Sequence, residues 1–188
     1  MGRRLDHPEL ALDMQTELKQ QVVHFGEGAF TKVAAILDGL SVRSVFLIAD
    51  EPAYSASGAA EELELLLAER KVERFLGFRP NPRLEDIERG IEQFRSSSPE
   101  IVIAIGGGTA MDLAKLIGVL SAQQAGAREI ITGRGAIEVD GPPLVVLPTT
   151  AGTGSEATHF AVAYIDGRKY SVANPRFLPD YVVIDSRF

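Results

Sequence analysis

The hydrophobic residues of the chain fall into short, mostly apolar runs, separated by stretches in which apolar positions recur every three or four residues. Each short run is typical of a buried strand, and each periodic stretch is typical of an amphipathic helix. The predicted strands cover residues 21–25, 45–48, 72–78, 101–105, 144–147 and 181–184. Strands that alternate with helices predict an α/β fold, in which a Rossmann-like parallel sheet is flanked by helices.

The predicted helices lie between these strands. One runs from about Phe30 to Gly39, one is opened by Ser57 or Gly58, one carries an apolar stripe from Leu84 to Phe94, and one begins near Thr109. Residues 125–141 are rich in glycine and charge, which predicts an exposed loop with a short helical piece. Residues 1–18 are predicted to form a peripheral segment.

Two further apolar runs, 160–165 and 169–172, flank the dipeptide Asp166-Gly167. Asp-Gly between two apolar runs is a strong signal for a two-residue hairpin turn. We therefore expect an antiparallel β-hairpin to project from the domain, with Lys169 just after the turn.

The most informative stretch is Ile101 to Leu113, which reads as strand, glycine turn and helix. Gly106, Gly107 and Gly108 have no Cβ, so a ligand could approach the main chain closely. The amide groups at the start of the following helix attract anions such as phosphate. A turn that serves only tight packing of strand and helix is the alternative interpretation.

Two other stretches follow buried strands at the same predicted edge of the sheet. Asp50 comes directly after the strand 45–48, where its carboxylate could accept bonds from a ribose or simply cap a helix. The strand 144–147 continues into residues 148–156, which offer the hydroxyls of Thr149, Thr150 and Thr153 to ribose and phosphate oxygens. An Ω-like surface loop is the alternative interpretation for these residues.

Composition limits the possible functions. The 188 residues are 45% hydrophobic and carry a formal net charge of −7, which suits one globular domain and argues against a nucleic-acid surface. The chain has no cysteine and only three histidines, so a self-contained metal site is not expected. It contains no signal peptide and no apolar run near the roughly 18 residues that span a membrane, so we expect a cytoplasmic protein without membrane contact.

Three stretches together resemble the iron-containing (group III) alcohol dehydrogenase family. They are Gly106-Gly107-Gly108-Thr109-Ala110-Met111-Asp112, the sequence PTTAGTGSE from Pro148 to Glu156, and the hairpin that ends in Lys169-Tyr170. Phe25-Gly26-Glu27-Gly28, Asp50 and Asn81-Pro82 also fall where the family pattern places them. The resemblance covers nearly the whole chain from Val22 onward, and it implies the N-terminal dinucleotide-binding domain of that family, with a dehydroquinate synthase-like fold.

The resemblance implies an NAD-dependent oxidoreductase and assigns a role to each matching residue. The glycine turn at Gly106, with Gly107, Gly108 and Thr109, would bind the pyrophosphate, and Asp112 would lie towards the nicotinamide end. The remaining predicted contacts, on the adenosine and ribose side, are Thr149, Thr150, Thr153, Lys169 and Asp50. The carboxylate of Asp50 would also disfavour the 2′-phosphate of NADP. The family usually has serine at position 109, and Thr109 keeps the hydroxyl.

The resemblance also implies a metal that this chain does not bind. In the family, Fe²⁺ or another divalent metal is held by one aspartate and several histidines of a helical second domain. Nothing after Asp185 remains to supply them, so residues 1–188 are expected to be the dinucleotide-binding domain alone, with no catalytic or metal-binding residue and no activity of their own. The full-length protein is expected to be a homodimer.

The implied substrate is a small alcohol or aldehyde. His159 and Phe160 follow the GTGSE sequence and are candidates for the near wall of the substrate pocket. With Arg168 close by in the sequence, an anionic aldehyde such as phosphonoacetaldehyde is one possible substrate. A core or rim position for His159, with no substrate role, is the alternative.

Two other functions remain open at this point. Dehydroquinate synthases and glycerol dehydrogenases share the pattern GGG-x-x-x-D, but they lack GTGSE in the loop that follows the strand 144–147. A non-catalytic nucleotide-binding module is also compatible with the fold, because fold alone does not determine function.

Overall fold

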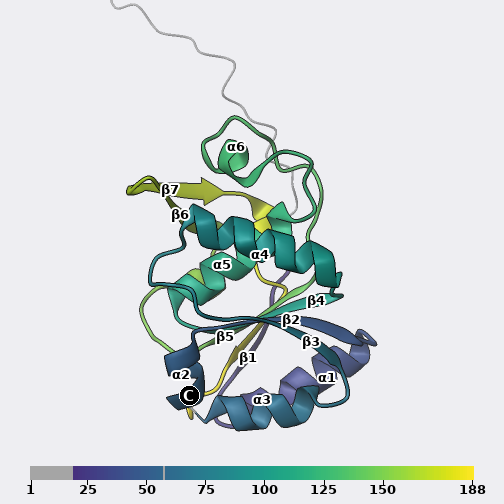
Figure 1. Cartoon of the computed structure of the whole chain (residues 1–188). Helices are drawn as coiled ribbons and strands as arrows, with labels where there is room; N and C mark the ends of the chain where they lie inside the picture. The colour runs from purple at the N-terminus through teal and green to yellow at the C-terminus, as the bar shows by residue number, and fades with distance from the viewer. Residues whose placement is uncertain (1–18, 57) are drawn as a thin grey trace, which may run out of the picture.

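The computed structural model describes residues 19–56 and 58–188. The predicted peripheral segment 1–18 and the candidate helix opener Ser57 lie outside these ranges. Six parallel strands form the main sheet in the order β1-β8-β5-β4-β2-β3 (Figure 1). Their bounds are Val22–Phe25 (β1), Ser44–Ala49 (β2), Lys71–Phe75 (β3), Ile101–Gly106 (β4), Leu144–Pro148 (β5) and Tyr181–Ile184 (β8). The predicted Rossmann-like parallel sheet is confirmed.

Helices cover both faces of this sheet (Figure 1). The α-helices are Lys32–Gly39 (α1), Glu51–Ala56 (α2), Ala59–Leu67 (α3), Leu84–Ser97 (α4), Gly108–Leu120 (α5) and Ala127–Ile131 (α6). Three short 3-10 helices are Ala29–Thr31 (η1), Ser155–Ala157 (η2) and Pro175–Phe177 (η3). No helix in the described ranges is long and apolar enough to cross a membrane.

The alternation of side chains along each strand divides the core into two layers. In β2, Phe46 and Ile48 pack on the side of α4, α5 and α6, whereas Val45 and Leu47 pack on the side of α1 and α3. Both faces of the central strands are therefore buried away from water. This explains why their sequences are continuous apolar runs rather than alternating ones.

The predicted hairpin is confirmed. Strands β6 (Phe160–Ile165) and β7 (Arg168–Ala173) pair antiparallel around Asp166 and Gly167, both of which have positive φ. The hairpin lies over α5 on the side away from the main sheet (Figure 1). As a result α5 is enclosed between two layers of strands.

Two details differ from the sequence-based expectation. The strand predicted over 72–78 ends at Phe75, because Gly77 has a φ of +70° and turns the chain away. The short helix α2 directly after β2 was not predicted, since six residues are too few to show a helical period.

Candidate functional site

The glycine turn lies at the carboxyl edge of the sheet, between β4 and α5. Gly106 has a φ of +142°, which side chains other than glycine rarely allow, whereas Gly107 has an ordinary extended backbone with φ −86° and ψ −169°. No described side chain caps the start of α5, and the first turn of this helix contains no acidic residue. The first amides of α5 are therefore left without an anionic partner from the described part of the chain.

Residues 148–156, which we call the threonine loop, pack directly against this turn. A Cβ placed on Gly107 would lie 3.0 Å from Thr150 Oγ1, and one placed on Gly108 would lie 3.1 Å from Thr153 Cγ2. The Oγ1 of Thr149 is buried and has no hydrogen-bond partner within the described residues. A buried hydroxyl without a partner is costly, which suggests that a ligand completes its hydrogen bonding. The structure thus brings the glycines and all three predicted threonines together.

Asp50 and Thr109 complete the group at this edge. A Cβ on Gly106 would lie 3.1 Å from the Cβ of Asp50, so the side chain of Asp50 begins beside the glycine turn. The Oγ1 of Thr109 accepts a bond from the backbone N–H of Asn81 at 3.2 Å. Parallel strands deliver residues from distant parts of the sequence to one edge, as expected for an α/β ligand site.

Asp112 is one helical turn further into α5, and both of its carboxylate oxygens are engaged by the protein. Its Oδ1 accepts from the hydroxyl of Ser155 at 2.8 Å, and its Oδ2 accepts from the backbone N–H of Val162 at 3.1 Å. Burial raises the pKa of Asp112, and these two bonds together with the charges of Lys115 and Lys169 oppose the rise. The predicted contact of Asp112 with the nicotinamide end of the cofactor remains a prediction.

Sequence reasoning missed Lys115, which is completely buried in α5. Its Nζ donates to the backbone carbonyls of Thr158 at 2.9 Å and Phe160 at 2.8 Å. Burial lowers the pKa of Lys115 to about 8, although the charges of Asp112 and Glu156 favour the protonated form. The available signal was a single lysine in a mostly apolar helix sequence, in which Asp112 is the other charged residue.

Lys169 lies on the exposed side of the hairpin, opposite Tyr164. The backbone N–H of Tyr164 donates to the carbonyl of Pro82 at 2.7 Å, next to Asn81. Because Asn81 is also bonded to Thr109, the hairpin turn lies on the side of the amino end of α5. This arrangement is compatible with the predicted ribose contact of Lys169, which remains a prediction.

His159 and Phe160 lie at the other end of the hairpin. Phe160 pairs with Ala173, whereas Arg168 pairs with Ile165 beside the turn. The expectation that Arg168 lies close to His159 is therefore wrong, because five residues of extended strand separate the two ends. The argument from Arg168 for an anionic aldehyde is lost, and the substrate role of His159 and Phe160 remains a prediction.

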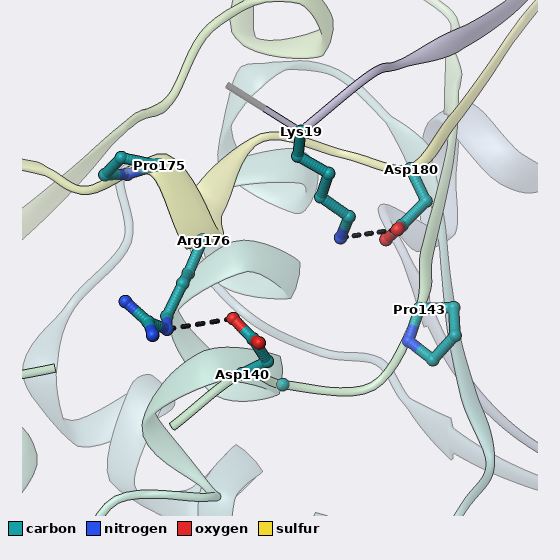
Figure 2. Close-up of a pocket in the computed structure, with 7 residues that line it drawn as sticks. Lys19, Asp140, Pro143, Pro175, Arg176 and Asp180 are labelled. Carbon is teal, nitrogen blue, oxygen red and sulfur yellow. Dashed lines mark ion pairs between the residues drawn. The ribbon is translucent and has the colours of Figure 1, made fainter. Parts of the chain in front are cut away.

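A cavity of about 330 Å³ opens at the carboxyl edge, lined by residues of the threonine loop and of the end of β8. A larger cavity of about 440 Å³ opens at the opposite edge of the sheet (Figure 2). There Arg176 pairs with Asp140 at 2.8 Å and Lys19 pairs with Asp180, so the labelled charges neutralise one another. We assign the site to the carboxyl edge, because the uncapped helix and the unpartnered hydroxyl are there.

Within residues 19–56 and 58–188, no three side chains of histidine, cysteine, aspartate or glutamate come together as a metal site. The described residues therefore do not fit a catalytic metal ion, and no step through a metal is assigned to them.

Comparison with known proteins agrees with the fold. The family model for iron-containing alcohol dehydrogenases matches residues 20–186. The long-chain-alcohol dehydrogenase 1 of Geobacillus thermodenitrificans is 30% identical over 166 residues, and the NAD-dependent methanol dehydrogenase of Bacillus methanolicus is 29% identical over 164 residues. The matched regions are 86% and 85% of this chain, respectively.

A solved structure shows the same arrangement. The sulfoacetaldehyde reductase of Bifidobacterium kashiwanohense, in complex with NAD⁺, superposes with a TM-score of 0.82 and 26% identity over 89% of this chain. The chain spans 42% of each of the two dehydrogenases and 45% of the reductase, which is less than half the length of these relatives.

Proposed function

The chain belongs to the iron-containing alcohol dehydrogenase family, and from this membership we propose that residues 1–188 are the dinucleotide-binding domain of an enzyme that transfers hydride between NAD and an alcohol or aldehyde. The nicotinamide cofactor supplies the hydride chemistry when it is bound. The residues of this chain bind and orient it. Among the three relatives above, the names of two state a dependence on NAD or a complex with NAD⁺.

One observation carries the proposal: the uncapped amino end of α5 meets glycines at which a Cβ would make a tight contact, and a threonine loop with a buried hydroxyl that has no partner among the described residues. The amides of Gly108 and Thr109, at the positive end of the helix dipole, suit a pyrophosphate. The hydroxyls of Thr149, Thr150 and Thr153 suit ribose and phosphate oxygens. The positions of these groups support the assignment of the pyrophosphate to the glycine turn.

Asp50 accounts for the choice between NAD and NADP. Its side chain begins beside Gly106, where the carboxylate would accept bonds from the hydroxyls of the adenosine ribose. A 2′-phosphate at the same place would meet a like charge at short range. We therefore propose NAD as the preferred cofactor.

We assign the remaining functions of the enzyme to a region that corresponds to the part of the relatives outside the match with this chain. The divalent metal of the family, Fe²⁺ or another ion, would be held there, since the described residues offer no set of three ligands. The part of the substrate pocket that faces the predicted wall of His159 and Phe160 is assigned there as well. That the full-length protein is a homodimer and is located in the cytoplasm remain predictions.

Calorimetric titration of the purified chain with NAD, NADP and ATP tests the proposal. We expect NAD to bind with a one-to-one stoichiometry and to bind more tightly than NADP, with or without added Fe²⁺. Equal affinity for all three nucleotides would support a general nucleotide-binding module instead. No binding of NAD to a folded protein that contains both halves of the enzyme would refute the proposed function.

A further inference from the structure

The helix α5 is buried on every side. All residues from Ala110 to Leu120 are buried, because the main sheet, α4 and the hairpin each cover one side of the helix. Two of these buried side chains carry charge: Asp112 is 7% exposed and Lys115 is 0% exposed. Charged side chains are almost never buried to this extent unless they have specific partners.

The partners of both side chains belong to one short segment, residues 155–162. Asp112 accepts from the Ser155 hydroxyl and the Val162 amide, and Lys115 donates to the carbonyls of Thr158 and Phe160. We call Asp112 and Lys115 the buried clamp. Asp112 binds the two ends of the segment, at Ser155 and Val162, and Lys115 binds its middle, at Thr158 and Phe160. The path of the segment is therefore defined at each end and in the middle.

The segment 155–162 connects two parts of the proposed site. It begins where the loop with Thr149, Thr150 and Thr153 ends, and it continues into the hairpin that carries Lys169. The clamp itself extends from α5, whose amino end is the proposed pyrophosphate site. One rigid helix therefore positions all three elements at once.

Stability alone does not explain the clamp. A buried charge pair loses much of its hydration energy, and apolar residues of similar volume often give an equally stable or more stable core. Glu156 and Lys169 also face the pair and partly balance its charges. What apolar residues could not provide is a fixed geometry, because only directional bonds determine where the carbonyls and the amide of the segment lie.

We propose that Asp112 and Lys115 are positioning residues, which hold the threonine loop and the hairpin in register with the amino end of α5; for Asp112 this role adds to its predicted contact with the cofactor. Loss of the clamp leaves the fold intact and frees the segment 155–162. The affinity for NAD then falls because the loop must be ordered when the cofactor binds. This inference rests on the proposed function.

The test compares Lys115→Met with Lys115→Gln and with Ile117→Val, by NAD titration and by amide hydrogen exchange. Methionine fills the space of lysine but cannot donate, so we expect the NAD dissociation constant to rise about tenfold. Glutamine keeps two N–H donors on a shorter side chain, and it should restore part of the affinity. Ile117→Val, on the α4 side of the same helix, is the matched control and should leave the affinity unchanged.

Hydrogen exchange separates positioning from general stability. In the apo form of Lys115→Met, the amides of residues 158–162 should lose protection, while those of β4 keep it. Ile117→Val should instead lower protection in both regions or in neither. If Lys115→Met binds NAD as the unsubstituted protein does, the inference is wrong; if the unsubstituted protein does not bind NAD at all, the proposed function is wrong as well.

Ser155→Ala is a second variant, which removes one bond of the clamp and keeps both of its charged side chains. It should fold even where Lys115→Met does not. We expect a rise of about threefold in the NAD dissociation constant, together with faster exchange of the Val162 amide, because Asp112 is held by one bond fewer. Unchanged affinity and unchanged exchange in this variant would overturn the inference.

Discussion

Two glycine turns lie at the carboxyl edge of the same sheet and differ in one physical respect. Gly26-Glu27-Gly28 leads from β1 into η1 and α1, and Gly106-Gly107-Gly108 leads from β4 into α5. In the first turn the chain provides its own anion: the carboxylate of Asp185 accepts from the backbone N–H of Phe30 at 3.0 Å. In the second turn no described side chain caps the helix.

The reason for glycine also differs between the two turns. Gly26 and Gly28 have φ values of +128° and +79°, and a Cβ on either would meet nothing within 4 Å. Their backbone conformation requires glycine. Gly107 and Gly108 have no positive φ, but a Cβ on either would crowd a threonine. At these two positions the tight contact with a threonine favours glycine, and the backbone conformation does not require it.

The comparison shows how similar sequence patterns acquire different roles. Strand, glycine turn and helix predict an anion site at both places. Only the turn after β4 leaves this site open to an external anion. In the other turn the site is already filled by Asp185, which is 155 residues away from Phe30 in the sequence. The predictions below test this difference.

The largest effect is expected for Asp185→Ala. The carboxylate of Asp185 is 3% exposed and is bound by the guanidinium of Arg187 as well as by the Phe30 amide. Removing it leaves the Phe30 amide without its partner and leaves Arg187 paired with Glu62 alone, so we expect the free energy of unfolding to fall by about 2 to 3 kcal/mol. Urea unfolding measures this loss. A loss below about 1 kcal/mol would mean that the first turn does not depend on its internal anion.

The same carboxylate predicts a pH dependence. The Arg187 guanidinium holds the pKa of Asp185 well below its ordinary value of 3.8. The unfolded chain therefore binds the proton first, so the contribution of Asp185 to stability is complete above about pH 5 and is lost as the pH falls through 4 and below. Asp185→Asn, which keeps one acceptor, should show a weaker dependence on pH in this range.

The second prediction concerns the carboxylate beside the other turn. For Asp50→Gly we expect the preference for NAD over NADP to narrow by roughly 1 to 3 kcal/mol, because a close like-charge contact with the 2′-phosphate is removed. Dissociation constants for both cofactors provide the measurement. Glu51→Gln, which removes an exposed charge one residue further on, is the matched control and should leave the ratio unchanged. An unchanged ratio in Asp50→Gly would limit Asp50 to a structural role.

The sequence predicted most of the fold because its signals are local. Strand runs such as 101–105, and the turn at Asp166-Gly167, are set by a few adjacent residues. The placement of Asp50 at the same edge of the sheet as Gly106 was predicted as well, since parallel strands deliver their ends to one edge. Lys115 was not found, because its partners Thr158 and Phe160 are 43 and 45 residues away and nothing in the local pattern marks them.

The distinction between the two turns could not be read from the sequence for the same reason. Whether Gly108 is required by its φ or by a neighbour depends on where Thr153 lies, and this is a tertiary contact. The position of Arg168 was misjudged because proximity in the sequence was taken for proximity in space. In a hairpin, residues at the turn and residues at the base are at opposite ends.

The third prediction tests the role of space at the second turn. In Gly108→Val the added methyl groups would push against Thr153 and occupy the approach to the helix amides. We expect the affinity for NAD to fall at least about tenfold, or roughly 1.4 kcal/mol. Since no φ is strained, the melting temperature of the apo protein should fall much less than in the core variant Ile103→Ala. A folded Gly108→Val that binds NAD normally would contradict the assignment of the pyrophosphate to this turn.

The smallest effect is expected for Gly28→Ala, in the turn that already contains its anion. Alanine at a φ of +79° is strained by about 1 kcal/mol, although its Cβ has free space. Stability should fall by this amount while the affinity for NAD stays the same. Gly107→Ala is the same substitution in the other turn, where the opposite result is expected. The φ of −86° at Gly107 suits alanine, but the added Cβ would lie 3.0 Å from Thr150 Oγ1. There we expect weaker binding with little loss of stability. Melting curves and NAD titrations of both variants decide the matter: if Gly28→Ala weakened binding and Gly107→Ala only lowered stability, the two turns would have the reverse of the roles assigned to them.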